Sequence, residues 1–484
     1  MLFNSFAFCI FFVLVLLFYF LLPHKLRWVF LLLASCIFYM FFKPEYILIL
    51  AFITVVTYLT GLKMEASEDH RKKKQYLIIS LIANIAILAF FKYYNFINGN
   101  ITGLINLFGW SNPIPYLDIL LPVGLSFYTF QAMSYSIEVY RNKQKAERHF
   151  GIYSLYLMFF PKLVAGPIER PQNLLPQFGA RQAFSWLNLL TGFRLMAWGF
   201  FKKLVIADRL AMYVNDIYYD PANHHWLSLV LAAVFFSLQL YFDFSGYSDI
   251  AIGAAKTLGF DLMQNFNAPY SAKSVSEFWR RWHISLSTWV NDYLYTPLMI
   301  ATRDYRKAGL VFSLLVAFLT IGLWHGASWN YIVFGLLQGV ALSYEALTKK
   351  LRKKISSKAS PALYNSFSNF LVLLFWSFSL IFFRANSTNE ATEIIKNIFS
   401  FNSQIPFSHL VIQANYVQFG TVSLVIVVVA SALAFFAERK LKYDLTDLNS
   451  GKKQLADILF TTACVTSILA LGVFQKTGFI YIQF

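Results

Sequence analysis

Apolar runs of about 15–22 residues recur along the whole chain, and they constrain its fold more than any single motif. Runs of this length suit helices that cross a bilayer, whereas the helices of soluble proteins carry charges at shorter intervals. A mean hydropathy of +0.53, with 13% of residues charged, agrees with this interpretation. A helix satisfies its own backbone hydrogen bonds in lipid, so the sequence predicts an all-α, polytopic membrane protein.

Some of the apolar runs are short or broken, and we therefore expect about eleven transmembrane helices together with re-entrant and interfacial helices. The polar stretch 385–414 is expected outside, with an amphipathic helix near Ala391–Phe399. No internal repeat or long linker is visible, so one membrane domain over 1–484 is predicted. The runs lie near residues 2–22, 28–43, 46–62, 76–92, 118–136, 151–165, 186–206, 226–242, 309–324, 329–347, 364–384, 415–437 and 455–474, the last two forming C-terminal spans within 415–474.

The formal charge of +17 comes from Lys and Arg gathered in short loops between apolar runs, such as Arg71–Lys74 and Lys349–Lys354. Membrane topology requires basic loops of this kind, and they attract anionic headgroups. Membrane lipid, and not nucleic acid, is therefore the expected partner. Basic loops on the cytoplasmic side place the N-terminus outside and predict a multi-pass protein of the inner or plasma membrane.

Cysteine usage and motif content exclude several kinds of chemistry. Cys9, Cys36 and Cys464 all fall inside apolar runs and lack the spacing of metal ligands, so no metal site is expected. The chain contains no Walker loop, no Rossmann glycine fingerprint and no H-E-x-x-H motif. ATP hydrolysis, nicotinamide chemistry and zinc proteolysis lose support, and no bound cofactor is predicted.

His325 ends the apolar run Leu310–Trp324, between Gly322 and Gly326. An ionisable ring at membrane depth is costly and marks a candidate functional site, next to Trp324. The two basic loops on either side place His325 at the turn of a hairpin, in the outer half of the membrane. Burial keeps the imidazole neutral, so His325 can act as a general base. The structural alternative is a histidine bonded to a carbonyl in a helix turn.

A second histidine, His283, lies in a basic and aromatic stretch, 256–307, that we interpret as helices in or under the cytoplasmic interface. His283 then sits at the cytoplasmic mouth of a tunnel, or is an interfacial histidine whose tip reaches water. Arg280 and Arg281 could meet phosphates of a donor or hold the segment to anionic lipid. The remaining candidates for the donor site or tunnel in this stretch are Trp282 and Ser285.

Two other places interrupt the apolar pattern. Pro161–Arg170 combines two prolines with a glycine, which favours a re-entrant turn lining a cavity over a kinked helix end. Asp243 and Asp249 follow a long apolar run and should pair or face a cavity. Pairing of these carboxylates with Arg194 or Lys203 is possible, and a structural role is slightly favoured over a catalytic one. Asp243 is also a candidate for the donor site or tunnel.

These blocks together resemble the membrane-bound O-acyltransferase family, and within it the bacterial alginate O-acetylation branch. The blocks that carry the resemblance are Leu121–Gln131, Leu163–Pro167, Tyr241–Asp249, Phe278–Leu286 and Gly322–Gly326, in this order along the chain. The resemblance implies a helical core, at about 100–384, with a tunnel through the bilayer. It also implies that His325 matches the catalytic histidine and His283 the second position of the bacterial pattern.

The resemblance implies the reaction as well. The family transfers an acyl group from a cytoplasmic thioester to a hydroxyl reached from the far side of the membrane. In the alginate branch the implied donor is acetyl-CoA, and an SGNH-type acyltransferase outside passes the acetyl group to a polysaccharide. Two alternatives stay open: D-alanyl transfer to teichoic acid within the same family, and a multi-span transporter or flippase.

Overall fold

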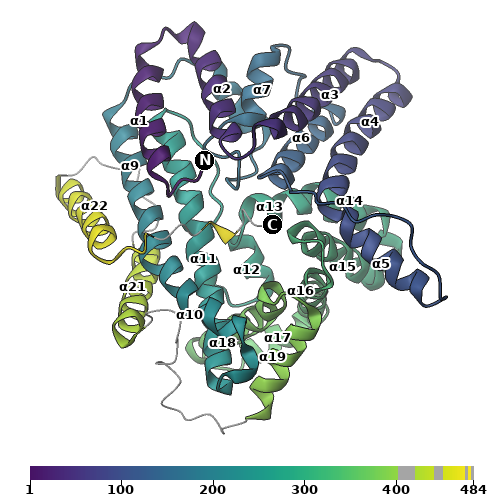
Figure 1. The fold of residues 1–484 in the computed structure, drawn as a ribbon, viewed down its shortest axis with the longest axis vertical. Coiled ribbons are helices and arrows are strands. Elements are labelled where there is room, and N and C mark those ends of the chain that lie inside the picture. The colour runs from purple at the N-terminus through teal and green to yellow at the C-terminus, as the bar shows by residue number, and fades with distance from the viewer. Residues whose placement is uncertain (402–419, 441–450, 475–477, 481–484) are drawn as a thin grey trace. The chain divides into compact units, whose positions relative to one another are not determined.

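The computed structural model describes residues 1–401, 420–440, 451–474 and 478–480, and their regular elements are helices (Figure 1). The prediction of an all-α protein is confirmed. The beginning of the 415–437 run and the end of the 385–414 stretch lie outside the described residues. The remainder of that stretch contains α19 (Thr388–Ser400), which confirms the helix expected there.

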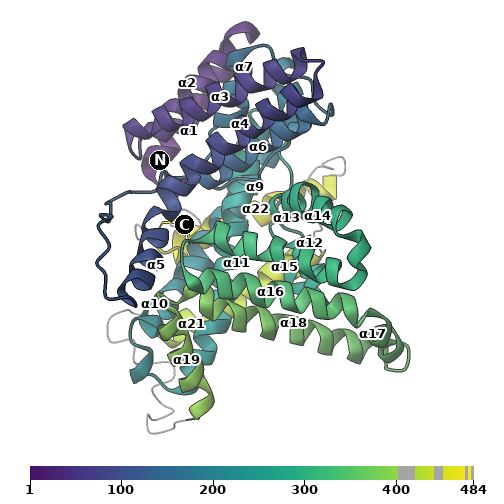
Figure 2. The same ribbon diagram turned by 90° about the vertical axis from the view of Figure 1, so that its right-hand side faces the viewer.

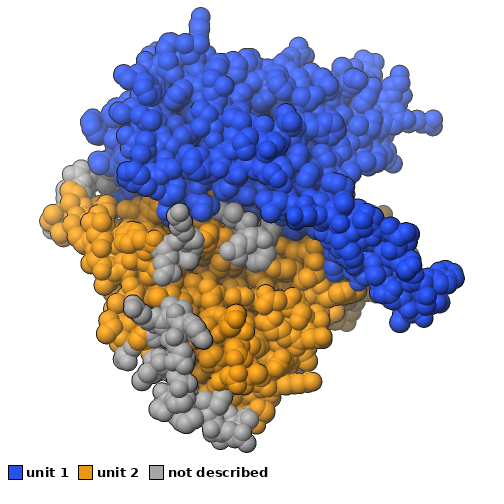
Figure 3. All heavy atoms as spheres, in the orientation of Figure 1, with its two compact units in different colours: residues 1–196, 250–263, 481–483 blue, residues 197–249, 264–480, 484 orange. Residues whose placement is uncertain are grey.

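The chain packs as two compact units, coloured separately in Figure 3. The prediction of one membrane domain stays a prediction. Unit 1 contains α1 (Phe6–Leu21), α2 (His24–Met40), η1 (Pro44–Tyr46), α3 (Ile47–Ala66), α4 (His70–Leu88), η2 (Ala89–Tyr93), α5 (Tyr94–Asn106), α6 (Leu125–Tyr140), α7 (Phe150–Met158) and α8 (Pro171–Gly179).

Unit 2 carries the second half of the chain, and α9 (Trp186–Phe201) and α11 (Trp226–Thr257) have residues in both units. Its elements are η3 (Lys202–Ala207), α10 (Asp208–Tyr219), η4 (Pro221–Asn223), η5 (Pro269–Ser271), α12 (Val275–Arg281), α13 (Ile284–Val290), η6 (Asn291–Tyr295), α14 (Thr296–Ala301), η7 (Arg303–Tyr305), α15 (Arg306–His325), α16 (Trp329–Leu347), α17 (Lys349–Ser356), α18 (Pro361–Arg384), α19, α21 (Thr421–Lys440) and α22 (Gly451–Leu471).

Among the described residues, five helical stretches are long and apolar enough to cross a membrane, and α16 with α17, bent by 66°, gives a sixth. Three shorter apolar helices accompany them, so the count of eleven stays a prediction. The five stretches are Pro44–Ala66, His70–Asn106, Trp226–Thr257, Arg303–His325 and Pro361–Arg384.

In unit 1, α3, α4 and α6 pack against one another. The run expected at 118–136 becomes helical only at Leu125, after the left-handed Gly124. Between α7 and α8 the chain forms a buried, non-helical turn at Pro161–Arg170, as its prolines and glycine predict. Lys162 in this turn donates to Oε1 of Gln131 over 2.7 Å.

In unit 2, α15, α16 and α18 run side by side (Figure 2). The run expected at 226–242 continues as helix to Thr257, so Asp243 and Asp249 lie inside α11. The interpretation of 256–307 as helices in or under the interface stays a prediction, but Trp279, Trp282 and Trp289 are buried against the protein instead of being exposed on its surface. Short helices α12 and α13 turn these rings inward, where they pack on other aromatic side chains.

Candidate active site

His325 is the last residue of α15, at the turn into α16, as the sequence predicts. Its side chain is buried, with a relative exposure of 2%. The ring centroid lies 5.0 Å from that of Phe383 and 4.9 Å from that of Trp324. Aromatic walls of this kind exclude water from the ring.

The glycines around His325 allow the hairpin to close. A Cβ on Gly326 would lie 2.0 Å from the Tyr331 ring, and one on Gly322 would lie 2.2 Å from the Tyr331 carbonyl oxygen. On the facing helix, a Cβ on Gly335 would meet the Phe318 carbonyl at 2.4 Å. Small residues let membrane helices approach backbone to backbone. The glycines thus fix the place of His325 by bringing α15 and α16 together.

His283 lies between α12 and α13 in the left-handed conformation, with φ 43° and ψ 55°. This conformation is uncommon for residues other than glycine, although histidine adopts it more readily than most, and such strain is often found at functional sites. Of the two alternatives for His283, the one in which its tip reaches water is wrong, because the residue has a relative exposure of 0%. The ring of Phe244 from α11 covers it, at 4.7 Å between centroids.

The amide of Asn265, which the sequence reasoning missed, holds His283 in one tautomer. Its Oδ1 accepts hydrogen bonds from the Ser285 backbone N–H at 3.2 Å and from the Ser285 hydroxyl at 2.9 Å, and lies 3.1 Å from His283 Nδ1. A backbone N–H only donates, so the amide atom facing it is the oxygen. Because that oxygen only accepts, His283 Nδ1 carries the proton. Nε2 then holds the lone pair that can accept another.

Burial also sets the charge of His283. Desolvation lowers the pKa of its imidazole to about 3, so the ring is neutral at physiological pH. Nothing along the sequence points to Asn265, which lies 18 residues before His283, in a segment without regular structure. An asparagine is a common loop residue, so only the folded geometry reveals its role.

Trp324 brings the two histidines into one site. Its ring centroid lies 5.9 Å from that of His283 and 4.9 Å from that of His325. Ser285 joins the site through Asn265, whereas Trp282 packs 4.9 Å from Trp376 in the surrounding aromatic core. The structure thus gathers two buried histidines beside one indole ring, which suits proton transfer at a buried centre.

A cavity of about 560 Å³ lies between α12, α13, η6, α15 and α16, and residues close in sequence to the two histidines line it. Ile284, the residue after His283, and Ile321, one turn before His325, both line it. Arg280 lines it as well and is exposed, with Nη1 2.8 Å from the Ser276 hydroxyl. Arg281 instead pairs with Glu277 at 2.8 Å.

Asp243 lies in a different cluster, the buried ion network around η3. Its Oδ1 is 2.6 Å from Lys203 Nζ, so it makes one of the two pairings that the sequence allowed. Its Oδ2 accepts from the Ile480 backbone N–H at 2.8 Å. Within the described residues, no group of three or more His, Cys, Asp or Glu side chains is arranged to hold a metal ion.

These features define a multi-span helical membrane protein with a buried two-histidine site. A model of the membrane-bound O-acyltransferase family matches residues 148–385, which include His283 and His325. The chain belongs to this family and is an O-acyltransferase. The transporter alternative is therefore wrong.

The most informative relatives share the family but differ in the activity that their names give. A probable alginate O-acetylase, AlgI, of Azotobacter vinelandii is 36% identical over 85% of this chain and 80% of its own length. A peptidoglycan O-acetyltransferase of Helicobacter pylori is 33% identical over 78% of this chain and 75% of its own. A teichoic acid D-alanyltransferase of Bacillus subtilis is 28% identical over 50% of this chain and 64% of its own.

Proposed function

We propose that this enzyme transfers an acetyl group from a cytoplasmic thioester, acetyl-CoA, across the membrane for O-acetylation of an extracytoplasmic polysaccharide. The observation that carries the proposal is the pair of buried histidines on one indole ring, inside the segment that matches the family. The relatives named as O-acetylating enzymes align over more than three quarters of the chain, whereas the D-alanyltransferase aligns over half. This difference favours acetyl over D-alanyl transfer.

In the proposed reaction, His325 acts as the general base. A ring nitrogen of His325 takes the proton of the acceptor hydroxyl while the hydroxyl oxygen forms a bond to the thioester carbonyl carbon. The carbon–sulfur bond then breaks, and the departing thiolate receives a proton from an imidazolium. His283 stands next to the same indole as a second neutral base. Aromatic packing around both rings keeps out water that would hydrolyse the thioester.

The donor is proposed to occupy the cavity lined by Arg280, Ile284 and Ile321. A thioester of coenzyme A carries phosphates, and an exposed guanidinium beside an apolar cavity suits them. Arg280 is better placed for this contact than Arg281, which is engaged by Glu277. Trp282, Ser285 and Trp324 are proposed to support the donor site or tunnel, whereas Asp243 belongs to the ion network around η3.

The setting in the cell is proposed from the same reasoning. Basic loops on the cytoplasmic side place the N-terminus outside, in the inner or plasma membrane. The acceptor hydroxyl then belongs to the polysaccharide itself or to an SGNH-type acyltransferase that relays the acetyl group to it. In either case the acceptor approaches His325 from the side of the membrane opposite to the donor.

The decisive experiment replaces His325 with alanine in cells that lack the native copy. O-acetyl content of surface glycans, measured by mass spectrometry, should fall about 10²–10⁴-fold because a positioned base is lost. The matched control, His24→Ala at the start of α2, should acetylate normally, and both variants should be present in the membrane at wild-type amounts. Normal acetylation by His325→Ala would refute the assignment.

The Bacillus relative makes D-alanyl transfer the second candidate. Membrane vesicles supplied with labelled acetyl-CoA or with a D-alanyl carrier-protein thioester separate the two. Label transfer from acetyl-CoA alone, dependent on His325, is expected. Transfer from the D-alanyl thioester alone would show that the enzyme transfers D-alanine and not acetate. The proposed role of His325 would still hold.

A further inference from the structure

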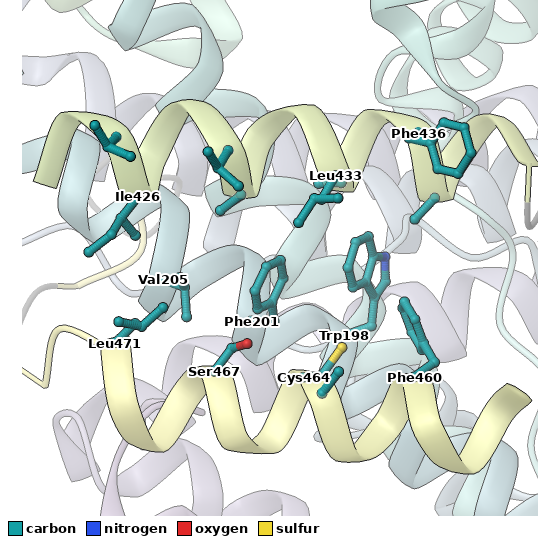
Figure 4. Close-up of a pocket in the computed structure, with 16 residues that line it drawn as sticks. Trp198, Phe201, Val205, Ile426, Leu433, Phe436, Phe460, Cys464, Ser467 and Leu471 are labelled. Carbon is teal, nitrogen blue, oxygen red and sulfur yellow. The ribbon is translucent and has the colours of Figure 1, made fainter. Parts of the chain in front are cut away.

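A second cavity of about 560 Å³ lies far along the sequence from the histidines, between α9–η3, α21 and α22 (Figure 4). Trp198 and Phe201 project into it from α9, Leu433 and Phe436 from α21, and Phe460 from α22. Its walls are almost wholly apolar. The volume falls in the range of ligand-sized pockets, and in a membrane protein the ligand abundant enough to fill such a groove is an acyl chain.

One end of this groove carries a cation. Arg209 of α10 donates from Nη1 to the Ser423 hydroxyl at 2.9 Å and from Nη2 to the Leu471 carbonyl at 2.6 Å. Leu471 lines the groove, and Ser423 lies two residues before the lining residue Val425. The guanidinium therefore joins the start of α21 to the end of α22, which places it at a helix-terminal level.

Arg209 has no anionic partner within the part of the chain that the structure describes, and its Nε–H finds no acceptor there. A charge beside a membrane helix normally pairs. Guanidinium groups bind phosphate oxygens through two or more parallel hydrogen bonds. A phospholipid phosphate would supply the missing charge at the height where helix ends meet headgroups.

The other end of the groove is already neutralised. Lys202 Nζ lies 5.4 Å from the Trp198 ring, and Asp249 and Glu438 hold it at 2.5 and 3.5 Å. Lys202 is fully buried and engaged by both carboxylates, so it cannot receive a headgroup. The phosphate must then lie at the Arg209 end, and the acyl chain must extend from Arg209 toward Trp198.

We propose that the groove between α21 and α22 binds one membrane phospholipid, with an acyl chain in the cavity and its phosphate on Arg209. The lipid fills the space that side chains of α9, α21 and α22 leave among themselves. The lipid thereby contacts both the C-terminal helices α21 and α22, which lie beyond the segment matched by the family, and α9, the helix that precedes η3.

The test uses the full chain in vesicles that contain phosphatidylglycerol with a photoreactive group in one acyl chain. Labelled peptides should come from α9, α21 and α22. Ala430→Trp fills the groove and should abolish this labelling, whereas Leu469→Trp, at an exposed position of α22, should leave it unchanged. Equal labelling of Ala430→Trp and wild type would overturn the proposal.

The headgroup contact is tested with a diacylglycerol probe that has the same acyl chains but no phosphate. Arg209→Gln should lower phospholipid labelling of the groove about five-fold, as expected for one cation at the membrane surface, and should not change diacylglycerol labelling. Arg209→Lys should label nearly as wild type, and so should Arg181→Gln, at an exposed position of unit 1. Undiminished phospholipid labelling of Arg209→Gln would also overturn the proposal.

A measurement on the wild-type protein covers the case in which variants fold poorly. Phosphatidylglycerol added to the detergent-solubilised chain should raise its Tm, because a ligand of the native state stabilises it, and diacylglycerol should raise it less. Equal effects of the two lipids, or none, would contradict a phosphate on Arg209.

Discussion

Unit 2 buries two clusters of polar side chains, and the two clusters differ in how burial of polar groups is made tolerable. Around His283 and His325 aromatic rings enclose the polar side chains, and burial keeps the His283 ring neutral. Around η3 they are ions: Lys203 lies 2.6 Å from Asp243 and 2.9 Å from Asp208. A neutral base remains ready to take a proton, whereas ions that neutralise one another are held in place.

The local backbone explains the ionic cluster. η3 is a π-helical turn whose six residues are all buried, so the consecutive Lys202 and Lys203 both require partners in the protein. Those partners come from α10, α11 and α21, and the Tyr241 hydroxyl adds a hydrogen bond to Glu438 at 2.7 Å. The cluster therefore joins elements far apart in sequence. We infer that it stabilises the fold and that the histidine cluster performs the chemistry.

The largest effect expected from this comparison is on folding. Lys203→Met leaves Asp243 and Asp208 buried without their cation, which should cost about 3–5 kcal/mol of stability and remove most folded protein from the membrane. The measurement is the fraction of chain recovered as a monodisperse peak in detergent. His325→Ala, by contrast, should be recovered like wild type.

A compensating variant separates charge from shape. Lys203→Met combined with Asp243→Leu removes a cation and an anion together, so it should recover part of the lost stability. If the single and double variants are equally depleted, the ion pair is not what stabilises this region, and the contrast between the clusters fails.

The next effect tests whether the histidine cluster depends on neutrality. Asn265→Asp keeps the acceptor for Ser285 and His283 but places a negative charge on it, which should raise the pKa of His283 by about 1–3 units. Acetyl transfer should then acquire an acid limb near pH 4–6 that wild type lacks. Rates measured across pH 4–8 report this, with Asn265→Ala as the control that removes the acceptor without adding charge. Parallel pH profiles for Asn265→Asp and wild type would show that His283 does not take part.

Burial of a neutral histidine also predicts how stability depends on pH. The folded His283 ring binds a proton only near pH 3, whereas the unfolded ring binds one near its ordinary pKa of 6.5. Between these values the unfolded state holds more protons, so this contribution to stability is complete above pH 6.5 and is lost as the pH falls. From pH 6.5 to 5 the loss should be about 2 kcal/mol.

The unfolding transition in detergent measures this loss. Wild type should unfold at lower temperature at pH 5 than at pH 7, and His283→Gln, which has no proton to gain, should change less. The same decrease in both proteins would assign the pH dependence to other groups.

The sequence predicts those features that depend on hydrophobic length and chain breaks. The hairpin at Gly322–Gly326, the turn at Pro161–Arg170 and the helix at α19 all follow from local pattern, and all are present. Lys203, the partner of Asp243, was one of the two candidate cations, whereas Asp249 pairs with Lys202, which was not a candidate. For the hairpin, the turn and the helix, neighbouring residues along the chain carry the information.

Features that arise from contacts distant in sequence were not predictable in the same way. The stretch 256–307 looks interfacial because arginines and tryptophans alternate in it, yet α12 and α13 fold so that Arg280 faces outward while Trp279 and Trp282 are buried. Asn265 is recognised only when its amide meets His283. Tertiary packing decides which face of a short helix is buried, and the spacing of hydrophobic residues along so short a segment does not reveal that face.

The smallest expected effects concern the two neighbouring arginines, and they sharpen the distinction between a charge that binds substrate and one that is paired. Arg280→Gln should raise the KM for acetyl-CoA about five-fold with little change in kcat, because an exposed cation in the donor cavity contributes on the order of 1 kcal/mol to phosphate binding. Arg281→Gln removes a half-exposed i,i+4 pair with Glu277 and should cost only about 0.5 kcal/mol of stability. Steady-state kinetics on both variants, with Lys396→Gln as an exposed control on α19, measure the difference. A larger KM effect for Arg281→Gln than for Arg280→Gln would mean that the donor displaces Glu277 and binds on the other side of α12 from the cavity.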